Sequence, residues 1–249
     1  MKMSRTLKLD SILIAIDSIT GSMPVVQAAS ELAMRSGAEL KALFIEDDEW
    51  YKASRVSFSY QISSITGELM PFDEAVMMKQ SRAHSSLLER MLVNHSRQLN
   101  IRCSYQTVRG SVIRELMEAA SGHDLVVIGR NRKPDGSLSR IGGKARFLAE
   151  NCTLPVLVWN GGPQWPDIIT GVIEPGSDEE NVNGWTRLIG NYLNRVTETV
   201  HADLTELSHI SETGRLRDKN RLPVIERHRD KDATPHPHLE VIPNSVLLV

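Results

Sequence analysis

One stretch of the sequence constrains the fold more than any other: Asp124 to Trp159 reads as strand, loop, helix and strand. Leu125 to Ile128 is an unbroken apolar run rich in β-branched residues, which is typical of a strand buried on both faces. A loop rich in glycine and cationic residues runs from Gly129 to Gly143, and an amphipathic helix then ends at Leu154-Pro155. Val156 to Trp159 completes a βαβ unit. Because open α/β sheets bind ligands at the carboxyl edge, this loop is the first candidate site.

The residues before this stretch repeat the same alternation of strand and helix. Strand patterns at 12–17, 40–45 and 101–108 are separated by helical patterns, of which the longest covers 72–99. Residues 50–72 show no sustained period, and we expect an irregular excursion with one helical turn at most. Five strands and four helices in alternation predict an α/β fold with a doubly wound, five-stranded parallel sheet and right-handed crossovers.

A turn-forming sequence at 160–163 divides the chain into a domain at 1–160 and a smaller partial α/β repeat at 161–249. In the second part, an apolar strand at 168–173 precedes a long helix whose apolar face we extend from Trp185 to Val200. This order echoes the first part of the chain and indicates a degenerate internal repeat.

The end of the chain is less regular. We expect a further strand at 201–210 and a strand within 241–249, whereas 212–240 is dense in charge, proline and histidine. Such a composition is typical of an exposed or mobile segment.

The overall charge and the cysteine content exclude several classes of protein. A formal net charge of -2 argues against broad nucleic-acid binding, so any anion site must be local. Two cysteines are too few for a disulfide framework, and we expect a cytoplasmic protein. We expect no membrane association, since no apolar run approaches the roughly 20 residues that a transmembrane helix needs.

The first 160 residues resemble the universal stress protein family. The resemblance rests on the ILIAID strand that ends at Asp17, on VRGSVIREL at 108–116, and on DLVVIGR followed by Gly142-Gly143 and TLPVLVW. It implies the adenine nucleotide alpha hydrolase-like fold, in a tandem arrangement whose second domain is degenerate and shortened.

In ATP-binding members of that family, a loop of the form G-x2-G-x9-G-[ST] wraps the phosphates, and the aspartate after the first strand lies beside the adenosine. Gly129 and Gly142 match the first and third glycines, whereas Arg132 replaces the second glycine and Gly143 replaces the hydroxyl residue. The resemblance therefore implies the fold more strongly than it implies the ligand.

The candidate nucleotide site combines a glycine loop with cations. Its residues are Asp17, Gly129, Arg132, Gly142, Gly143 and Lys144. Cations around a helix N-terminus favour an anion such as a phosphate group of ATP or AMP. The simpler interpretation, which we prefer, is that the cations of this loop are solvated, and no cofactor is then required.

No arrangement of catalytic or metal-binding residues emerges from the sequence, and we expect that the protein is not an enzyme. The favoured hypothesis is a cytoplasmic stress-response regulatory or interaction module that binds protein partners. We expect a homodimer or an intrachain pseudo-dimer formed through edge strands. The alternative hypothesis is a stress protein that binds ATP or AMP and senses or slowly hydrolyses the nucleotide.

Overall fold

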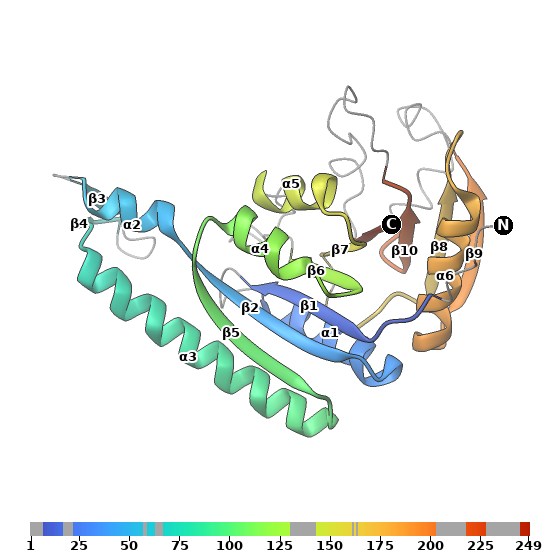
Figure 1. The fold of residues 1–249 in the computed structure, drawn as a ribbon, viewed down its shortest axis with the longest axis horizontal. Helices are drawn as coiled ribbons and strands as arrows, with labels where there is room; N and C mark the ends of the chain where they lie inside the picture. Colours follow the sequence, from blue (N-terminus) through green and yellow to red (C-terminus); the bar gives the residue numbers. More distant parts are fainter. Residues whose placement is uncertain are drawn as a thin grey trace.

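A computed structural model of the chain describes residues 7–16, 22–56, 59–62, 67–129, 143–160, 162, 164–202, 218–227 and 245–249. Strands of these residues line up in one sheet through the middle of the molecule, with helices on both faces (Figure 1). None of the described helices is both long enough and apolar enough to cross a membrane.

The N-terminal unit, residues 7–160, has the predicted parallel arrangement. Its main strands are β1 (Ser11–Ile16), β2 (Glu39–Asp47), β5 (Cys103–Gly110), β6 (Leu125–Gly129) and β7 (Val156–Trp159). The helices between them are α1 (Ser22–Ser36), α3 (Glu74–Leu99), α4 (Val112–Ala120) and α5 (Gly143–Asn151). These five strands pair in parallel in the order β5-β2-β1-β6-β7, which confirms the doubly wound α/β fold.

The prediction for 50–72, an irregular excursion with one helical turn, was right about a helical turn and wrong in missing a hairpin. Helix α2 (Asp48–Ser54) begins directly after β2, where the Asp47 carboxylate accepts the N–H of Glu49 at 3.1 Å. Strands β3 (Tyr60–Ile62) and β4 (Leu69–Pro71) then form a separate antiparallel hairpin. Elements this short have no periodicity that a sequence window can detect.

Helix α3 begins and ends where side-chain chemistry requires. The Asp73 carboxylate accepts the N–H groups of Ala75 and Val76, which satisfies donors that have no partner within the helix. At the other end Asn100 adopts a left-handed conformation with φ of 53°, as expected for the residue that terminates this helix.

The C-terminal unit, residues 164–249, is a shortened copy of the same pattern. It contains β8 (Ile168–Ile173), α6 (Glu179–Leu193), β9 (Val196–His201), β10 (Arg221–Ile225) and β11 (Val246–Leu248). The predicted helix through Val200 was wrong, because α6 ends at Leu193 and Asn194 is left-handed with φ of 54°. The strand expected at 201–210 instead begins at Val196, and residues 203–210 lie outside the described part.

Within the segment predicted to be exposed, 212–240, the structure has the buried strand β10. Leu222, Val224 and Ile225 are almost completely buried between β8 and β11. The prediction was therefore wrong for 221–225, and residues 212–217 and 228–240 lie outside the described part.

The two units join into a nine-stranded sheet with the order β5-β2-β1-β6-β7-β11-β10-β8-β9. The junction is the antiparallel pair of β7 with β11, in which Val158, Leu157 and Val156 face Val246, Leu247 and Leu248 in turn. This register is symmetric about the Leu157–Leu247 pair, so the units are related by a pseudo-twofold axis. Part of the predicted intrachain pseudo-dimer through edge strands is thus visible as strand pairing.

Both faces of the sheet carry a core that extends across this junction. Helices α1, α3 and α6 contribute to the core on one face, and α4 and α5 contribute to the core on the other. In Figure 1, α4 and α5 accordingly lie above the strands while α3 lies below them.

The connection between the units is anchored to the N-terminal unit. The Trp165 indole N–H donates to the carbonyl of Ala28 in α1 at 3.0 Å, and Trp165 packs against Trp159 with ring centroids 4.7 Å apart. Both indoles are buried. Trp165 is therefore part of the core and fixes this connection in place, although Gln164 beside it is exposed.

Candidate functional site

The strand order reverses at β1, because β2 follows on one side of it and β6 lies on the other. Such a switch point leaves a crevice at the carboxyl ends of the strands, where ligands of open α/β sheets bind. The register pairs Ala15 with Ile128, so the end of β1 at Ile16 lies beside the end of β6 at Gly129.

The amino ends of the same two strands are fixed to each other. The Asp124 carboxylate accepts the backbone N–H groups of Asp10 and Ser11 at 2.8 and 2.9 Å. Since these residues lead into β1 and Asp124 leads into β6, the contact holds the register of the two strands that form the crevice.

Three of the predicted site residues, Asp17, Arg132 and Gly142, lie outside the described residues. Asp17 directly follows β1, and Arg132 comes three residues after the end of β6. The structure therefore brings together the strand ends from which these residues leave. Their own positions stay a prediction.

Gly129, the first glycine of the motif, is the last residue of β6 and lies within the described part of the chain. A Cβ atom built on it would lie 2.9 Å from Cγ2 of Val25 in α1, which is closer than carbon atoms approach one another. Helix α1 can pack at this distance only because position 129 has no side chain. Packing alone thus explains this glycine, whether or not a phosphate group binds beside it.

Gly143 differs, because it lies in open space at the first residue of α5. A Cβ atom there would meet nothing within 4 Å among the described residues. Lys144 follows in the first turn, although its side chain lies outside the described part. The first turn of α5 offers backbone N–H groups to an anion at the carboxyl edge.

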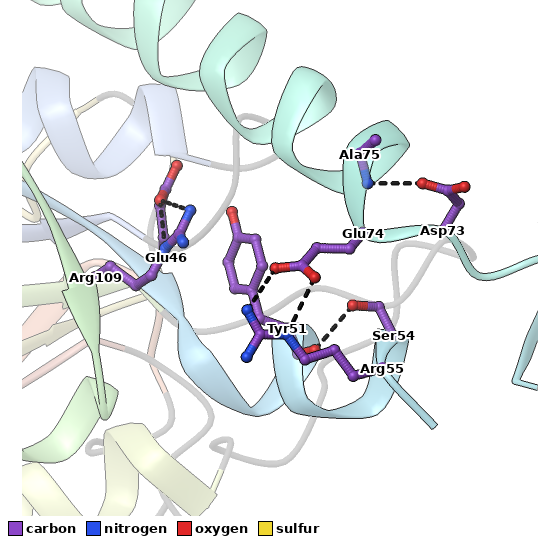
Figure 2. A network of polar contacts seen from close by, with 8 residues as sticks. All are labelled: Glu46, Tyr51, Ser54, Arg55, Asp73, Glu74, Ala75 and Arg109. Carbon is purple, nitrogen blue, oxygen red and sulfur yellow. Dashed lines mark hydrogen bonds and ion pairs between the residues drawn. The ribbon is translucent and has the colours of Figure 1, made fainter. Parts of the chain in front are cut away.

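A polar network that the sequence did not reveal lies at the carboxyl ends of β2 and β5 (Figure 2). The Arg109 guanidinium donates to the Glu46 carboxylate at 3.1 Å and stacks over the Tyr51 ring at 3.9 Å. The same carboxylate accepts the hydroxyl of Ser81 at 2.7 Å. Glu46, Ser81 and Arg109 thus satisfy one another, and these contacts hold α2 and α3 against the sheet, whereas the buried Tyr51 hydroxyl has no hydrogen-bond partner among the described residues.

A second part of the network lies at one end of the molecule, a tip formed by α2, the β3–β4 hairpin and the start of α3 (Figure 1). Arg55 at the end of α2 forms a bidentate pair with Glu74 at the start of α3, with distances of 2.8 and 3.0 Å. Hydrogen bonding to the Arg55 guanidinium holds the pKa of the Glu74 carboxyl below its usual value. Both side chains are partly exposed, so the pair contributes little stability.

A cavity of about 720 Å³ lies at this tip, away from the switch point. Its walls come from α2, from the β3–β4 hairpin and from the N-terminal turn of α3, and they include Val56, Tyr60, Phe72 and Met78. None of the predicted site residues lines it. This cavity is therefore a poor candidate for the nucleotide site of the sequence prediction.

The C-terminal unit carries a copy of the strand-and-loop sequence of β6. Residues 222–230 read LPVIERHRD and align with LVVIGRNRK at 125–133, which places Glu226 at the position of Gly129. The Glu226 carboxylate accepts the backbone N–H of Asp178, and the Asp178 carboxylate in turn accepts the N–H of Asn181 at 3.1 Å. The unit's own carboxylates therefore occupy the N-terminus of α6.

Glu174 completes this comparison between the units. It follows β8 as Asp17 follows β1, and it is buried with 5% exposure. In both units the strand that starts the repeat is thus followed by an acidic residue. In the C-terminal unit, that acid lies next to a helix end that is already capped.

Thiol and metal chemistry find no support in the part of the chain that the structure describes. No cluster of histidine, cysteine, aspartate and glutamate there is suited to a metal ion. Cys103 and Cys152 are both free, and Cys152 is buried in the core as its sequence context predicts. Burial raises the pKa of the Cys103 thiol, which disfavours the reactive thiolate.

Comparison with known proteins identifies one sequence family. The profile described as "Universal stress protein family" matches residues 8–160. A comparison with curated proteins gives no match.

Solved structures resemble the chain over nearly its full length. A universal stress protein from Archaeoglobus fulgidus DSM 4304 is 8% identical with a TM-score of 0.68, and the match covers 97% of this chain and 98% of that one. A functionally unknown protein from Pseudomonas aeruginosa PAO1 is 14% identical with a TM-score of 0.57, covering 97% and 92%. A putative universal stress protein from Pseudomonas aeruginosa UCBPP-PA14 is 15% identical with a TM-score of 0.56, covering 97% and 93%. At these identities the similarity establishes the two-unit fold and nothing finer.

Proposed function

Because the chain belongs to the universal stress protein family, we propose that it is a regulatory and interaction module of the stress response that performs no catalytic turnover. The observation that carries this proposal is the capping of α6 by Glu226 and Asp178, which places the chain's own carboxylates at a helix N-terminus where an anion would otherwise be favoured. At the carboxyl edge of the N-terminal unit, the motif glycine Gly129 has a packing role. The described residues of both edges are therefore explained without a bound nucleotide.

The proposal includes the division of the chain at residue 160. Residues 1–160 are one domain and residues 161–249 are a degenerate second repeat, which acts as an internal partner through β11. Two observations support this boundary: the family profile ends at residue 160, and the pseudo-twofold axis passes between β7 and β11. A cytoplasmic location is also part of the proposal and agrees with two free cysteines.

The second candidate function is binding of ATP or AMP by the N-terminal unit alone. One observation favours it, namely that Gly143 begins α5 in open space at the carboxyl edge, with Lys144 in the first turn. In that case Asp17, together with the cationic residues that follow β6, would complete the site.

Nucleotide extraction separates the two functions. Purified protein is denatured, and the supernatant is tested for adenine nucleotide; the thermal unfolding of the protein is then measured with and without millimolar Mg-ATP and AMP. A ligand at 100 times its dissociation constant stabilises the folded state by about 2.7 kcal/mol. The regulatory module predicts neither released nucleotide nor a shift in the unfolding temperature.

The number of nucleotide molecules bound per chain also distinguishes the two functions. If nucleotide binds at the N-terminus of α5, we expect one molecule per chain at this site. A Gly143→Asp variant places a carboxylate at the N-terminus of α5 and abolishes binding there by charge repulsion. One bound nucleotide per chain that this variant loses would establish the second function and refute the first.

A further inference from the structure

Strand β9 lies at one end of the nine-stranded sheet, and its outer edge has no strand partner among the described residues. We propose that two copies of this chain associate through this edge, with β9 of one copy antiparallel to β9 of the other around Glu198. This inference does not depend on the proposed function or on nucleotide binding.

The N-terminal unit shows what an edge at this position normally contacts. Strand β2 occupies there the place that β9 occupies in the C-terminal unit, and its outer edge is covered by β5 from Leu40 to Asp47. The C-terminal unit has no described counterpart of β5. The side chains of β9 are accordingly exposed or half-buried, and Val196 is 66% exposed.

The connection after β9 is too short to supply the missing parallel strand. In the N-terminal unit, residues 48–124 provide two crossovers and β5 between β2 and β6. In the C-terminal unit only residues 202–220 separate β9 from β10. Because each crossover to a parallel strand needs about a dozen residues, this connection has room for one crossover and no covering parallel strand.

Hydrogen-bond direction defines the free edge. The N–H of Val196 donates to Asp167 at 3.1 Å and the N–H of Ala202 donates to Ile173 at 3.0 Å, so the even-numbered residues face β8. Strand geometry therefore turns the backbone groups of Thr197, Thr199 and His201 outward. Residues 196–201 contain no proline or lysine, the residues that commonly protect such an edge.

The sequence of β9 is self-complementary in an antiparallel pair. Residues 196–200 read Val-Thr-Glu-Thr-Val, the same in both directions. Pairing around Glu198 places Val196 opposite Val200 and Thr197 opposite Thr199 of the second copy. Cross-strand pairs of these types are favourable, and each contributes roughly 0.2–1 kcal/mol.

The central carboxylate does not oppose this pairing. Glu198 accepts hydrogen bonds from Arg221 and from the hydroxyl of Thr170, so its charge is already compensated within its own unit. At the dyad, each Glu198 would therefore bring its own Arg221, which also contacts Asp218 at 3.5 Å. A second copy of the chain therefore matches this edge in backbone hydrogen bonding and in its cross-strand side-chain pairs.

Light scattering after size exclusion tests the proposal on the full chain. The expected mass is about twice the 27.8 kDa of one chain. Thr199→Pro removes an outward N–H and leaves the ladder to β8 intact, and we expect it to weaken the dimer at least tenfold. Thr199→Ala is the matched control, because it also loses the side-chain hydrogen bond to Asn183 but keeps the N–H.

A second variant is needed in case Thr199→Pro fails to fold. Val196→Asp changes a mostly exposed side chain and introduces a charge opposite Val200 of the partner, so it should give monomers with an unchanged unfolding temperature. A wild-type monomer would overturn the proposal. This holds also if hydrogen exchange shows that residues 1–6 or 203–217 of the same chain protect the β9 edge. A dimer that both variants leave intact would also overturn it.

Discussion

Leu157 of β7 lies opposite Leu247 of β11 at the centre of the only antiparallel pair in the main sheet of the described residues, and both side chains are buried. In this register each unit presents the same strand to the other, so the chain forms within itself an interface that two subunits would otherwise form. The core continues through this pair on both faces of the sheet. Stability of the two units should therefore be shared.

Leu247→Ala tests this shared stability. We expect a loss of about 2–5 kcal/mol in the free energy of unfolding, because the substitution removes buried methyl groups and leaves a cavity. Tryptophan fluorescence and circular dichroism should report a single coincident urea transition, which indicates that both units unfold together. Ile62→Ala, at an exposed position of the β3–β4 hairpin, is the control and should change the stability little. Two separate transitions in the wild type would contradict the prediction.

Arg227→Ala should weaken the contact between β10 and the turn that precedes β7. The Arg227 guanidinium donates to the carbonyl oxygens of Cys152 and Leu154, and the side chain is buried. Removing it leaves carbonyl groups without this donor, at a cost of about 1–3 kcal/mol. Chemical denaturation measures the loss. Arg187→Ala, which removes an arginine from the exposed surface of α6, should cost far less.

Gly129→Ala distinguishes packing from ligand binding as the reason for the motif glycine. In the absence of nucleotide we expect a loss of about 1–3 kcal/mol, because the new methyl group overlaps Cγ2 of Val25. Val25→Ala removes the methyl group that is in the way. The Gly129→Ala, Val25→Ala double variant should therefore be about 1 kcal/mol more stable than the sum of the two single effects predicts. Gly143→Ala is the control, since a Cβ atom there meets nothing within 4 Å among the described residues. Strict additivity of the two substitutions would remove the packing explanation.

His95 and His123 should make the protein less stable in mild acid. Burial lowers the pKa of both imidazoles below the value of about 6.5 expected in the unfolded chain. As the pH falls, the unfolded state therefore binds more protons than the folded state does. The contribution of the two histidines to the free energy of unfolding is complete above pH ~6.5 and is lost as the pH falls through the folded-state pKa values. Urea unfolding at about pH 7.5 and pH 5.5 measures the difference. The His95→Gln, His123→Gln double variant should reduce it, and an unchanged difference would refute the assignment.

The sequence was sufficient to predict the fold of the N-terminal unit. Strands buried on both faces, such as β6 and β7, appear as short apolar runs, and the long helix α3 ends at residues with clear capping chemistry. Each of these signals is local, so no knowledge of the tertiary structure was needed to detect them.

Two elements of the C-terminal unit were predicted wrongly because local patterns there were misleading. Val196 and Val200 continue the helical spacing of α6 beyond its true end, although the left-handed Asn194 already stops the helix. Strand β10 contains Pro223 and is flanked by charged residues, so its composition resembles that of a loop. The alignment of 222–230 with 125–133 was the signal that would have identified it.

The candidate site was less predictable than the fold. The role of Gly129 depends on how closely α1 packs against β6, and the role of Glu226 depends on its distance from the start of α6. Neither distance follows from a motif. The network of Glu46, Tyr51 and Arg109 brings together two segments that are far apart in the sequence, so no local pattern indicates it.

Strand β11 is the last strand in chain order, yet it lies in the middle of the sheet between β7 and β10. During synthesis, the ribosome releases it after both of its neighbours. Until then the nascent chain exposes one edge of β7 and one edge of β10, which are templates for aggregation. We therefore expect chaperones to bind these two edges until β11 has been synthesised, and removal of β11 should divide the sheet at its centre.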